Sequence, residues 1–362
     1  MVYYIRFLKT PRIQTQKTGS CIVSTLVCIT TDLGDAFLSH TVNLLVTLAI
    51  EHTKRIVYQE YVVWHAGRRE LSIYLGPFPR QLSKQDIILG ISATDARQPY
   101  PPSADDMNIR GRFSIPSVIS GWSAPFGHSN LVAESLVERR LRLKDELDLR
   151  IWEETGNSIA RHIWDAALAS IIYLRDAIDG QAETMLLLRE RLQSQGSLRI
   201  LELGSGCGIV GIALSQLLST CSIVLTDLPE VEDIVTRNTA AANPARSSSL
   251  EFQALDWDEE LSARICNGGN DLIVVSDCTY NADSLPALVS VMTKLVQLSP
   301  GALILVAVKR RHDSEAVFFD LMQAAELSKL DQDTIKLPSQ HDDEDQIELY
   351  TYGRKAKENI ST

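Results

Sequence analysis

The stretch LRILELGSGCGIVGIAL, residues 198–214, places four glycines between two apolar runs. The first run, which ends at Leu203, is typical of a buried strand. The glycines at 204, 206, 208 and 211 are more than a plain turn requires. Glycine lets backbone N–H groups approach a ligand where no Cβ stands in the way. We therefore expect a strand, a ligand-binding loop and a helix, in that order.

The residues around this loop predict a doubly wound sheet. An amphipathic helix is predicted for SIARHIWDAALASIIYL, which begins at Ser158 and places Ile159 and Ile163 on one face. Further helices are expected to begin near Cys207, Pro229 and Asp283. The expected strands are LRILELG, CSIVLTDL, LEFQALDW, DLIVVSD and GALILVAV. This alternation favours a mostly parallel sheet, and DTIKLP and IELYTYG, joined by a charged loop, predict an antiparallel hairpin at its edge.

The glycines fit two ligand-binding patterns. Counted from Gly206 they form G-x-G-x-x-G, which is typical of dinucleotide-binding turns, whereas counted from Glu202 they form E-x-G-x-G-x-G, which is typical of S-adenosylmethionine sites. Asp227, at the end of the second strand, is placed to bind ribose hydroxyls of either ligand. Glu202 favours S-adenosylmethionine, because a buried carboxylate offsets its ammonium and sulfonium but repels a pyrophosphate. The sequence also lacks the Tyr-x-x-x-Lys pair of nicotinamide oxidoreductases.

Five motifs within residues 158–353 occur in the order and spacing of one known family. They are IWDAALASIIYL, LELGSGCGIVGIAL, VLTDLPEVEDIVTRNTAAAN, LDW and SDCTYN. In these motifs the chain resembles the seven-β-strand protein-lysine methyltransferases of the METTL21-like group (methyltransferase family 16). The resemblance implies an α/β, class I (Rossmann-like) S-adenosylmethionine methyltransferase fold, whose seven-stranded, mostly parallel sheet ends in a C-terminal antiparallel hairpin. It also implies a protein substrate that presents a lysine.

The resemblance assigns roles to individual residues. Asp277 and Tyr280 match the D-x-x-Y motif after the fourth strand, where the target lysine enters, so Asp277 would position the lysine and Tyr280 would shape the channel. Ribose contacts are implied for Asp227, and a position near the adenine is implied for Trp257, just after Asp256 on the third strand. With Glu202 included, the expected cofactor-binding residues are Trp164, Glu202, Gly204, Ser205, Gly206, Asp227, Trp257 and Ser276.

Plainer interpretations of these residues stay open. An aspartate at the end of a parallel strand often caps the next helix, and Asp277 would fit that role. Trp164 and Trp257, taken alone, are more often core residues than cofactor contacts. The run KRRHD at 309–313 follows the fifth strand, and we expect it to be a solvated strand end, the alternative being that His312 lines the substrate entrance.

The first part of the chain predicts a different architecture. Strands are expected in CIVSTLVCITTDLGDAFL, VNLLVTLAI, RIVYQEYVVWHA and ELSIYLGPFP. Residues 95–130 are rich in Pro, Gly, Ser and Asp and predict a loop, and LVAESLVERRLRLKDELDLRIWEET predicts a helical or mixed segment that ends in a strand. We expect a β-rich N-terminal region at 1–150, either recognising the substrate or covering a sheet edge, and a methyltransferase domain at 151–357.

The amino-acid composition limits the cellular compartments and the classes of partner that we expect for this protein. The 362 residues contain no apolar run near the ~20 residues of a membrane span, and the N-terminus lacks the pattern of a signal peptide. Six scattered cysteines, without metal-ligand spacing, predict free thiols in a reducing compartment and no metal site. A net charge of −11 disfavours nucleic acid as a partner. We expect a cytoplasmic or nuclear protein without membrane contact, and a monomer because no long heptad run is present.

Three further functions stay open at this point. The same fold could methylate a small molecule, which the D-x-x-Y motif disfavours, or a nucleic acid, which the acidic charge and the absence of an N/D-P-P-Y motif disfavour. The chain could also be a non-catalytic interaction protein. The intact cofactor positions argue against this last function, but the unmatched N-terminal region keeps it open.

Overall fold

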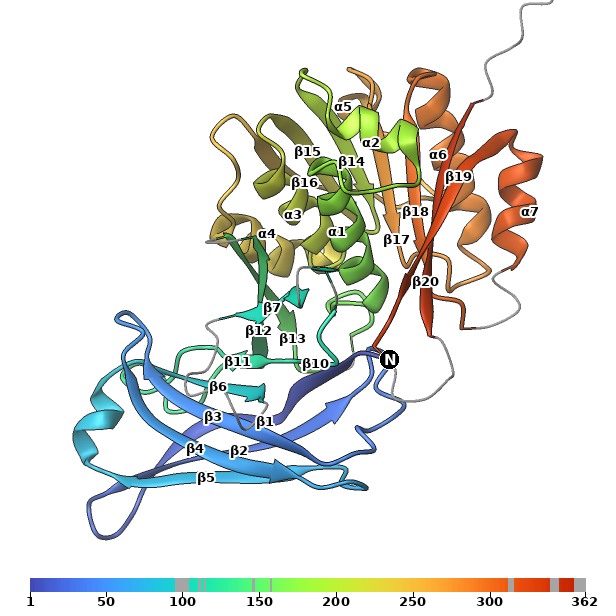
Figure 1. Ribbon diagram of the computed structural model, residues 1–362. Coiled ribbons are helices and arrows are strands. Elements are labelled where there is room, and N and C mark those ends of the chain that lie inside the picture. The colour runs from blue at the N-terminus through green and yellow to red at the C-terminus, as the bar shows by residue number, and fades with distance from the viewer. Residues whose placement is uncertain are drawn as a thin grey trace, which may run out of the picture. The chain divides into compact units, whose positions relative to one another are not determined.

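The structure, a computed structural model, describes residues 1–94, 104–109, 112–113, 115–144, 147–156, 158–311, 316–338 and 345–354 (Figure 1). The chain forms two compact units. The first comprises Met1–His162 and Pro338–Asp342, and the second comprises Ile163–Leu337 and Asp343–Thr362. Among the described residues, no helix is both long enough and apolar enough to cross a bilayer. All six cysteines are free thiols, as predicted.

The first unit is built almost entirely of strands. One sheet has the order β10-β1-β2-β5, and a second has the order β13-β12-β11-β6-β3-β4, with β7 beside β12. Both sheets contribute apolar side chains to one core, which includes Phe7, Leu48 and Trp64. The elements are β1 (Tyr3–Thr15), β2 (Cys21–Thr30), β3 (Val42–Ile50), β4 (Ile56–Trp64), β5 (Leu71–Phe78), η1 (Arg80–Lys84), β6 (Ile87–Ala93), β7 (Asp105–Asp106), β8 (Asn108–Ile109), β9 (Arg112–Phe113), β10 (Val118–Ile119), β11 (Gly121–Ser123), β12 (Leu136–Lys144) and β13 (Leu147–Glu154).

Two expectations for this unit were wrong. The segment predicted as helical or mixed forms strand β12, which pairs antiparallel with β13. Its charged residues Glu138 and Arg139 are both buried and ion-paired, and no local sequence pattern reveals such pairing. The predicted loop at 95–130 contributes β10 and β11 to the two sheets, because its polar backbone pairs with β1, β6 and β12.

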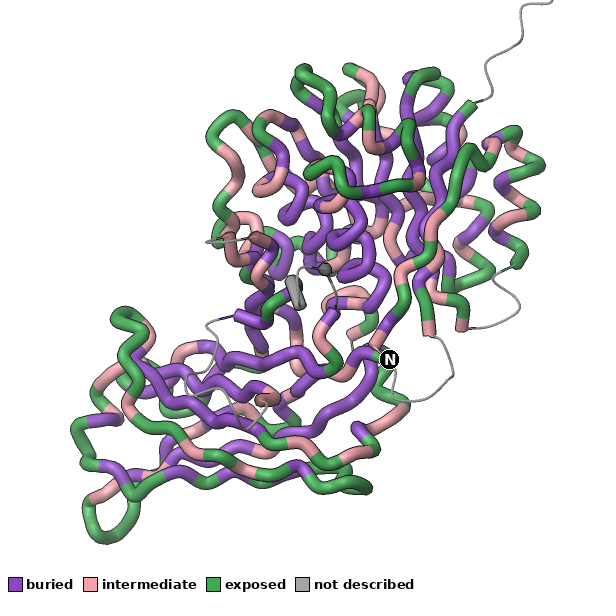
Figure 2. The backbone as a smooth tube through the Cα atoms, in the orientation of Figure 1, coloured by how far each residue is buried: buried purple, intermediate pink, exposed green. Residues whose placement is uncertain are grey.

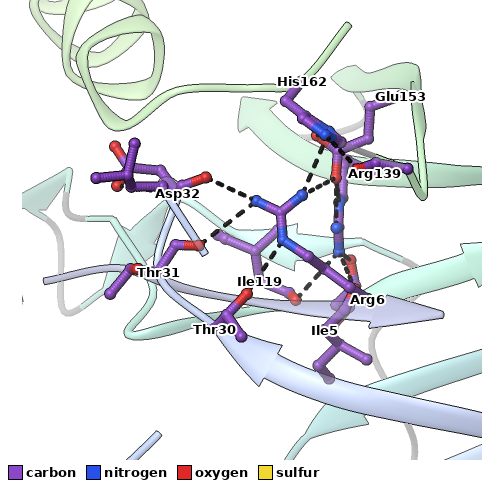
Figure 3. Close-up of polar contacts among 12 residues, drawn as sticks. Ile5, Arg6, Thr30, Thr31, Asp32, Ile119, Arg139, Glu153 and His162 are labelled. Carbon is purple, nitrogen blue, oxygen red and sulfur yellow. Dashed lines mark hydrogen bonds and ion pairs between the residues drawn. The ribbon is translucent and has the colours of Figure 1, made fainter. Parts of the chain in front are cut away.

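A buried ionic cluster ties the strands of the first unit together (Figure 3). The Arg139 guanidinium is fully buried; its Nε donates to Glu153 Oε1 at 2.9 Å, and its Nη1 donates to the carbonyls of Ile5 and Ser120, each at 2.8 Å. Arg6 lies 4.0 Å from Glu153 and contacts His162 Nδ1 at 3.3 Å. Burial would raise the pKa of Glu153, but the guanidinium of Arg139 holds it well below its usual range.

Breaking this cluster should destabilise the first unit. Glu153→Gln leaves the buried Arg139 cation uncompensated, so we expect the free energy of unfolding to fall by about 3–5 kcal/mol. Urea unfolding followed by tryptophan fluorescence measures the change. The matched control is Asp148→Asn on the same hairpin, whose pair with Arg142 is partly exposed, and it should cost less than about 1 kcal/mol. Equal losses in the two variants would contradict this role for the cluster.

The second unit contains the predicted seven-stranded sheet, in the order β16-β15-β14-β17-β18-β20-β19 (Figure 1). The first five strands are parallel, β20 runs antiparallel to β18, and β19 completes the C-terminal hairpin. The strand order reverses between β14 and β17, so ligands are expected at the carboxyl ends of these strands. The strands are β14 (Leu198–Leu203), β15 (Cys221–Asp227), β16 (Ser249–Ala254), β17 (Leu272–Ser276), β18 (Leu303–Val308), β19 (Leu327–Lys336) and β20 (Gln346–Arg354).

Helices cover both faces of this sheet, and its central strands are buried along most of their length (Figure 2). Helices α6 and α7 pack on the face that carries Leu203, Val275 and Val306. Helices α1 and α3 contact each other on the opposite face. The helical elements are α1 (Asp165–Ile178), α2 (Leu186–Leu192), α3 (Ile209–Leu217), η2 (Pro229–Val231), α4 (Glu232–Ala241), α5 (Ala263–Cys266), α6 (Leu285–Leu298) and α7 (Ala316–Ala324).

Two boundaries differ from the prediction. Helix α1 begins at Asp165 rather than near Ile159, which is exposed. The preceding residues follow the last strand of the first unit instead, because Arg161 pairs with Glu154 at 2.7 Å. The second difference concerns Trp257, which was expected at the end of the third strand of this sheet. That strand, β16, ends at Ala254, and Trp257 lies in the turn that follows it.

Candidate active site

The loop that joins β14 to α3 owes its shape to glycine. Gly204, Gly206 and Gly208 all have left-handed backbones, with φ of 67°, 53° and 79°. Side chains rarely adopt this conformation. A Cβ at Gly204 would also lie only 2.4 Å from Cys278 Sγ. Gly211 has another constraint: a Cβ there would meet Leu225 at 2.3 Å, so glycine lets α3 approach the sheet closely.

Two serine hydroxyls in and beside this loop are buried and have no hydrogen-bond partner in the described part of the chain. They are the Oγ atoms of Ser205, in the loop, and Ser276, at the end of β17. The Ser205 N–H donates to the carbonyl of Thr226 at 3.0 Å, which anchors the loop to β15. Buried polar groups are normally satisfied, so two orphan hydroxyls at neighbouring strand ends are suited to bind a polar ligand.

Asp227 lies beside the glycine loop at the end of β15. Its carboxylate accepts N–H bonds from Gly206 and Leu228, both at 2.7 Å. Burial raises the pKa of Asp227, and these two hydrogen bonds oppose the rise. The carboxylate therefore fixes the loop at the carboxyl end of β15.

Glu202 lies beneath the loop and is 2% exposed. Its Oε2 accepts the N–H of Gly211 at 2.7 Å, which joins β14 to the first turn of α3. Burial raises the pKa of Glu202 to about 8, and the nearby charge of Asp227 adds to the rise. The carboxyl thus holds a proton near neutral pH in this structure, and a cation bound nearby would favour its release.

Trp257 and Trp164 contact different residues near the glycine loop and the strand ends. Trp257 is half-buried, and its ring lies 3.3 Å from where a Cβ of Gly204 would stand. Trp164 is the residue before α1, in extended conformation, and its ring lies beneath the guanidinium of Arg311 at 5.1 Å from the ring centre. Both rings therefore lie close to the strand ends or to the glycine loop, and neither is a core residue far from them.

Asp277 follows β17 and is held by Arg311. The Nη1 and Nη2 atoms of Arg311 lie 2.7 and 2.8 Å from the two carboxylate oxygens. The interpretation of Asp277 as the cap of the next helix is wrong, because α6 begins at Leu285 with Ser284 before it. Tyr280 lies three residues farther along the chain and is 56% exposed.

The sequence patterns did not reveal several residues that build this edge. Within the described part of the run, 309–311, two residues form ion pairs instead of ending the strand in solvent: Arg311 pairs with Asp277, and the Lys309 Nζ lies 2.6 Å from the buried carboxylate of Asp165. His312 lies outside the described residues. Asn238 on α4 is fully buried and donates to the carbonyl of Cys207 in the loop at 2.9 Å. The position of KRRHD directly after a parallel strand was the one available signal, because ligands bind at that edge.

Comparison with known proteins identifies the family. The family model described as lysine methyltransferase matches residues 143–325, about half of the chain. The chain belongs to this lysine methyltransferase family. The family match confirms the expected activity, that of a protein-lysine N-methyltransferase, and the order of the seven-stranded sheet is that of the expected Rossmann-like fold.

Relatives of this lysine methyltransferase fall into two groups by length of match. The UPF0665 family protein C23C4.06c of Schizosaccharomyces pombe is 24% identical over 87% of this chain and 91% of its own. Protein N-lysine methyltransferase METTL21A of Danio rerio is 26% identical over 53% of this chain and 76% of its own. EEF1A lysine methyltransferase 3 of Xenopus tropicalis is 27% identical over 51% and 77%. Similarity to the fission yeast protein therefore extends well into the first unit.

The raised pKa of Glu202 predicts a pH-dependent stability. The folded protein keeps this proton up to about pH 8, whereas the unfolded chain releases it near the ordinary value of 4.5. Its contribution to the free energy of unfolding is therefore lost as the pH rises from about 4.5 to about 8. Glu202→Gln keeps an acceptor for Gly211 without the titrating proton. We expect the variant to gain stability relative to wild type across this range, as measured by urea unfolding.

The comparison between variant and wild type isolates this one group, because all remaining titrating groups are shared. The exposed Glu190 on α2 provides the control, and Glu190→Gln should track the wild type at every pH. If the Glu202→Gln and wild-type stabilities ran parallel from acid to alkaline pH, Glu202 would not carry a proton at neutral pH.

Proposed function

We propose that this lysine methyltransferase methylates the side-chain amine of a lysine in a folded protein at the carboxyl ends of β14, β15 and β17. The observation that supports this site most directly is the pair of buried hydroxyls, Ser205 and Ser276, that have no partner among the described residues and lie beside a glycine turn whose left-handed backbone disfavours side chains. This arrangement fits a polar ligand with an extended amino-acid end, such as the methyl donor.

The proposed cofactor contacts follow from the geometry. Gly204, Ser205 and Gly206 would contact the amino-acid end of the donor, and Asp227 would accept hydrogen bonds from its ribose hydroxyls. Trp257 would pack near the adenine and Trp164 would contact the donor from the start of α1. Ser276 would bind the donor from the end of β17. In this proposal Glu202 supports the loop from beneath and offers a carboxyl that ionises when a cation is bound.

The target lysine would enter beside Asp277, with Tyr280 forming an exposed wall of the entrance. When bound, S-adenosylmethionine supplies a methyl group that is activated by a positive sulfur. The chain's own residues supply alignment, which is worth about 7–11 kcal/mol when the reacting atoms are held near attack geometry. The lysine must first lose a proton, and transfer to a drier site lowers the pKa of its ammonium so that water can remove it. Asp277 would accept an N–H of the resulting amine and direct its lone pair.

The nature of the substrate and the location are also proposals. Relatives carry names that specify EEF1A and calmodulin as substrates, which supports a folded protein with an accessible lysine as the substrate class. Six free thiols, five of them buried, support a reducing compartment, that is, the cytoplasm or the nucleus. We expect the protein to act as a monomer.

Cofactor choice is tested by calorimetric titration of the full chain with S-adenosylhomocysteine and, separately, with NADH. We expect saturable binding of the first and none of the second, because Glu202 can ionise beside the ammonium of the first ligand, whereas the pyrophosphate of the second would oppose that ionisation. Incubation with methyl-tritiated S-adenosylmethionine and a eukaryotic cell extract should then label protein as methyllysine. Absence of S-adenosylhomocysteine binding would favour a non-catalytic interaction protein. Label found in small molecules or in nucleic acid, and not in protein, would show that the substrate belongs to that class instead.

The proposed lysine-positioning role predicts the effect of changing Asp277. Asp277→Ala should lower methyl transfer to the labelled protein by on the order of a hundredfold, because a misdirected amine loses alignment, while binding of S-adenosylhomocysteine changes little. Asp277→Asn tolerates the left-handed backbone of this residue and separates loss of charge from loss of fold. The control is Asp283→Ala, an exposed aspartate in the loop that follows. Normal turnover by Asp277→Ala would disprove the positioning role.

A further inference from the structure

The ion pair between Arg311 and Asp277 is bidentate and largely buried. Two guanidinium nitrogens face two carboxylate oxygens at 2.7 and 2.8 Å, which is the bidentate arrangement that gives both strength and orientation. The Asp277 side chain is 4% exposed and that of Arg311 is 20% exposed. The guanidinium also stacks on Trp164, so the cation contacts a residue of each proposed subsite.

The backbone at Asp277 adds a second, independent constraint. Its φ is 57°, a left-handed conformation that costs a non-glycine residue energy and persists only where the surroundings impose it. The N–H of Asp277 donates to the carbonyl of Ala307 on the neighbouring strand β18 at 2.9 Å. The carboxylate is therefore held from its backbone by β18 and from its oxygens by Arg311.

This pairing bears on the chemistry of the target amine. A solitary buried carboxylate would stabilise the ammonium form of an incoming lysine, yet only the neutral amine has the lone pair that attacks the methyl group. An ion pair between a carboxylate and a guanidinium carries little net charge. Its carboxylate still keeps lone pairs that can accept an N–H. We propose that Arg311 is a positioning residue that neutralises Asp277, so that the carboxylate orients the target amine without stabilising its protonated form. This inference rests on the proposed function.

The neighbouring charges at this edge do not replace Arg311. Lys309, the adjacent cation, lies 2.6 Å from the buried Asp165 at the start of α1. Among the described residues, the other titratable groups in and around the loop after β17 are acidic or neutral, so each of them would favour the ammonium form or leave it unaffected. They are Glu202 on β14, Asp227 on β15, Glu230 in η2, and Cys278 and Tyr280 in the loop after β17.

The test is the pH dependence of methyl transfer to the labelled protein, at saturating S-adenosylmethionine, from about pH 6 to about pH 10. Arg311→Gln removes the charge, so the bound amine should titrate about one unit higher, and the rate near neutral pH should fall about tenfold. Near the alkaline end the rates should converge, because the amine is then neutral in both proteins. Arg311→Lys keeps the charge and should restore the pH midpoint of the wild type, even if its rate is lower.

A merely structural role for Arg311 would lower the rate by the same factor at every pH. That result, or an unshifted midpoint in Arg311→Gln, would overturn the inference while leaving the proposed function intact. Arg310→Gln is the matched control, since Arg310 pairs with Glu348 on the exposed side of the same segment and should keep the wild-type profile. If wild-type protein that binds S-adenosylhomocysteine labels no protein at any pH, the proposed function fails, and the inference fails with it.

Discussion

The turn from β14 into α3 passes through three left-handed glycines, and the rest of the site is assembled around it. Asp227 accepts the N–H of Gly206, Glu202 accepts the N–H of Gly211, and Asn238 donates to a carbonyl of the same loop. Because these partners come from β15, β14 and α4, the loop is held from three directions. Such support keeps the backbone of the turn in place without a side chain on any of its three glycines.

Buried charge is handled in two ways in this protein. In the first unit Arg139 compensates Glu153, and in the second unit Lys309 compensates Asp165 and Arg311 compensates Asp277. Glu202 and Asp227 are different, because backbone N–H groups bind their carboxylates and burial raises the pKa of both. Compensated pairs are suited to fixed geometry, whereas a carboxyl whose pKa is raised by burial, as in Glu202, can respond to a bound cation.

The two units also differ in how far the relatives share them. The family model and the METTL21A relative each match about half of the chain, and the residues that the family model matches lie chiefly in the second unit. The fission yeast relative matches 87% of the chain, so the strand-built first unit is part of a longer arrangement that occurs in at least one further protein.

The sequence by itself determined the order of strands and helices in the second unit, the glycine turn and the choice of methyl donor. These features depend on residues that are neighbours along the chain, so hydrophobic periodicity and glycine spacing reveal them. Only the tertiary structure decided that Arg311 holds Asp277, that Glu202 binds Gly211, and that the charged segment at 136–144 is a buried strand. Each of these depends on a partner that folding brings from a distant part of the chain, and burial then determines whether a carboxylate is paired with a cation or keeps its proton.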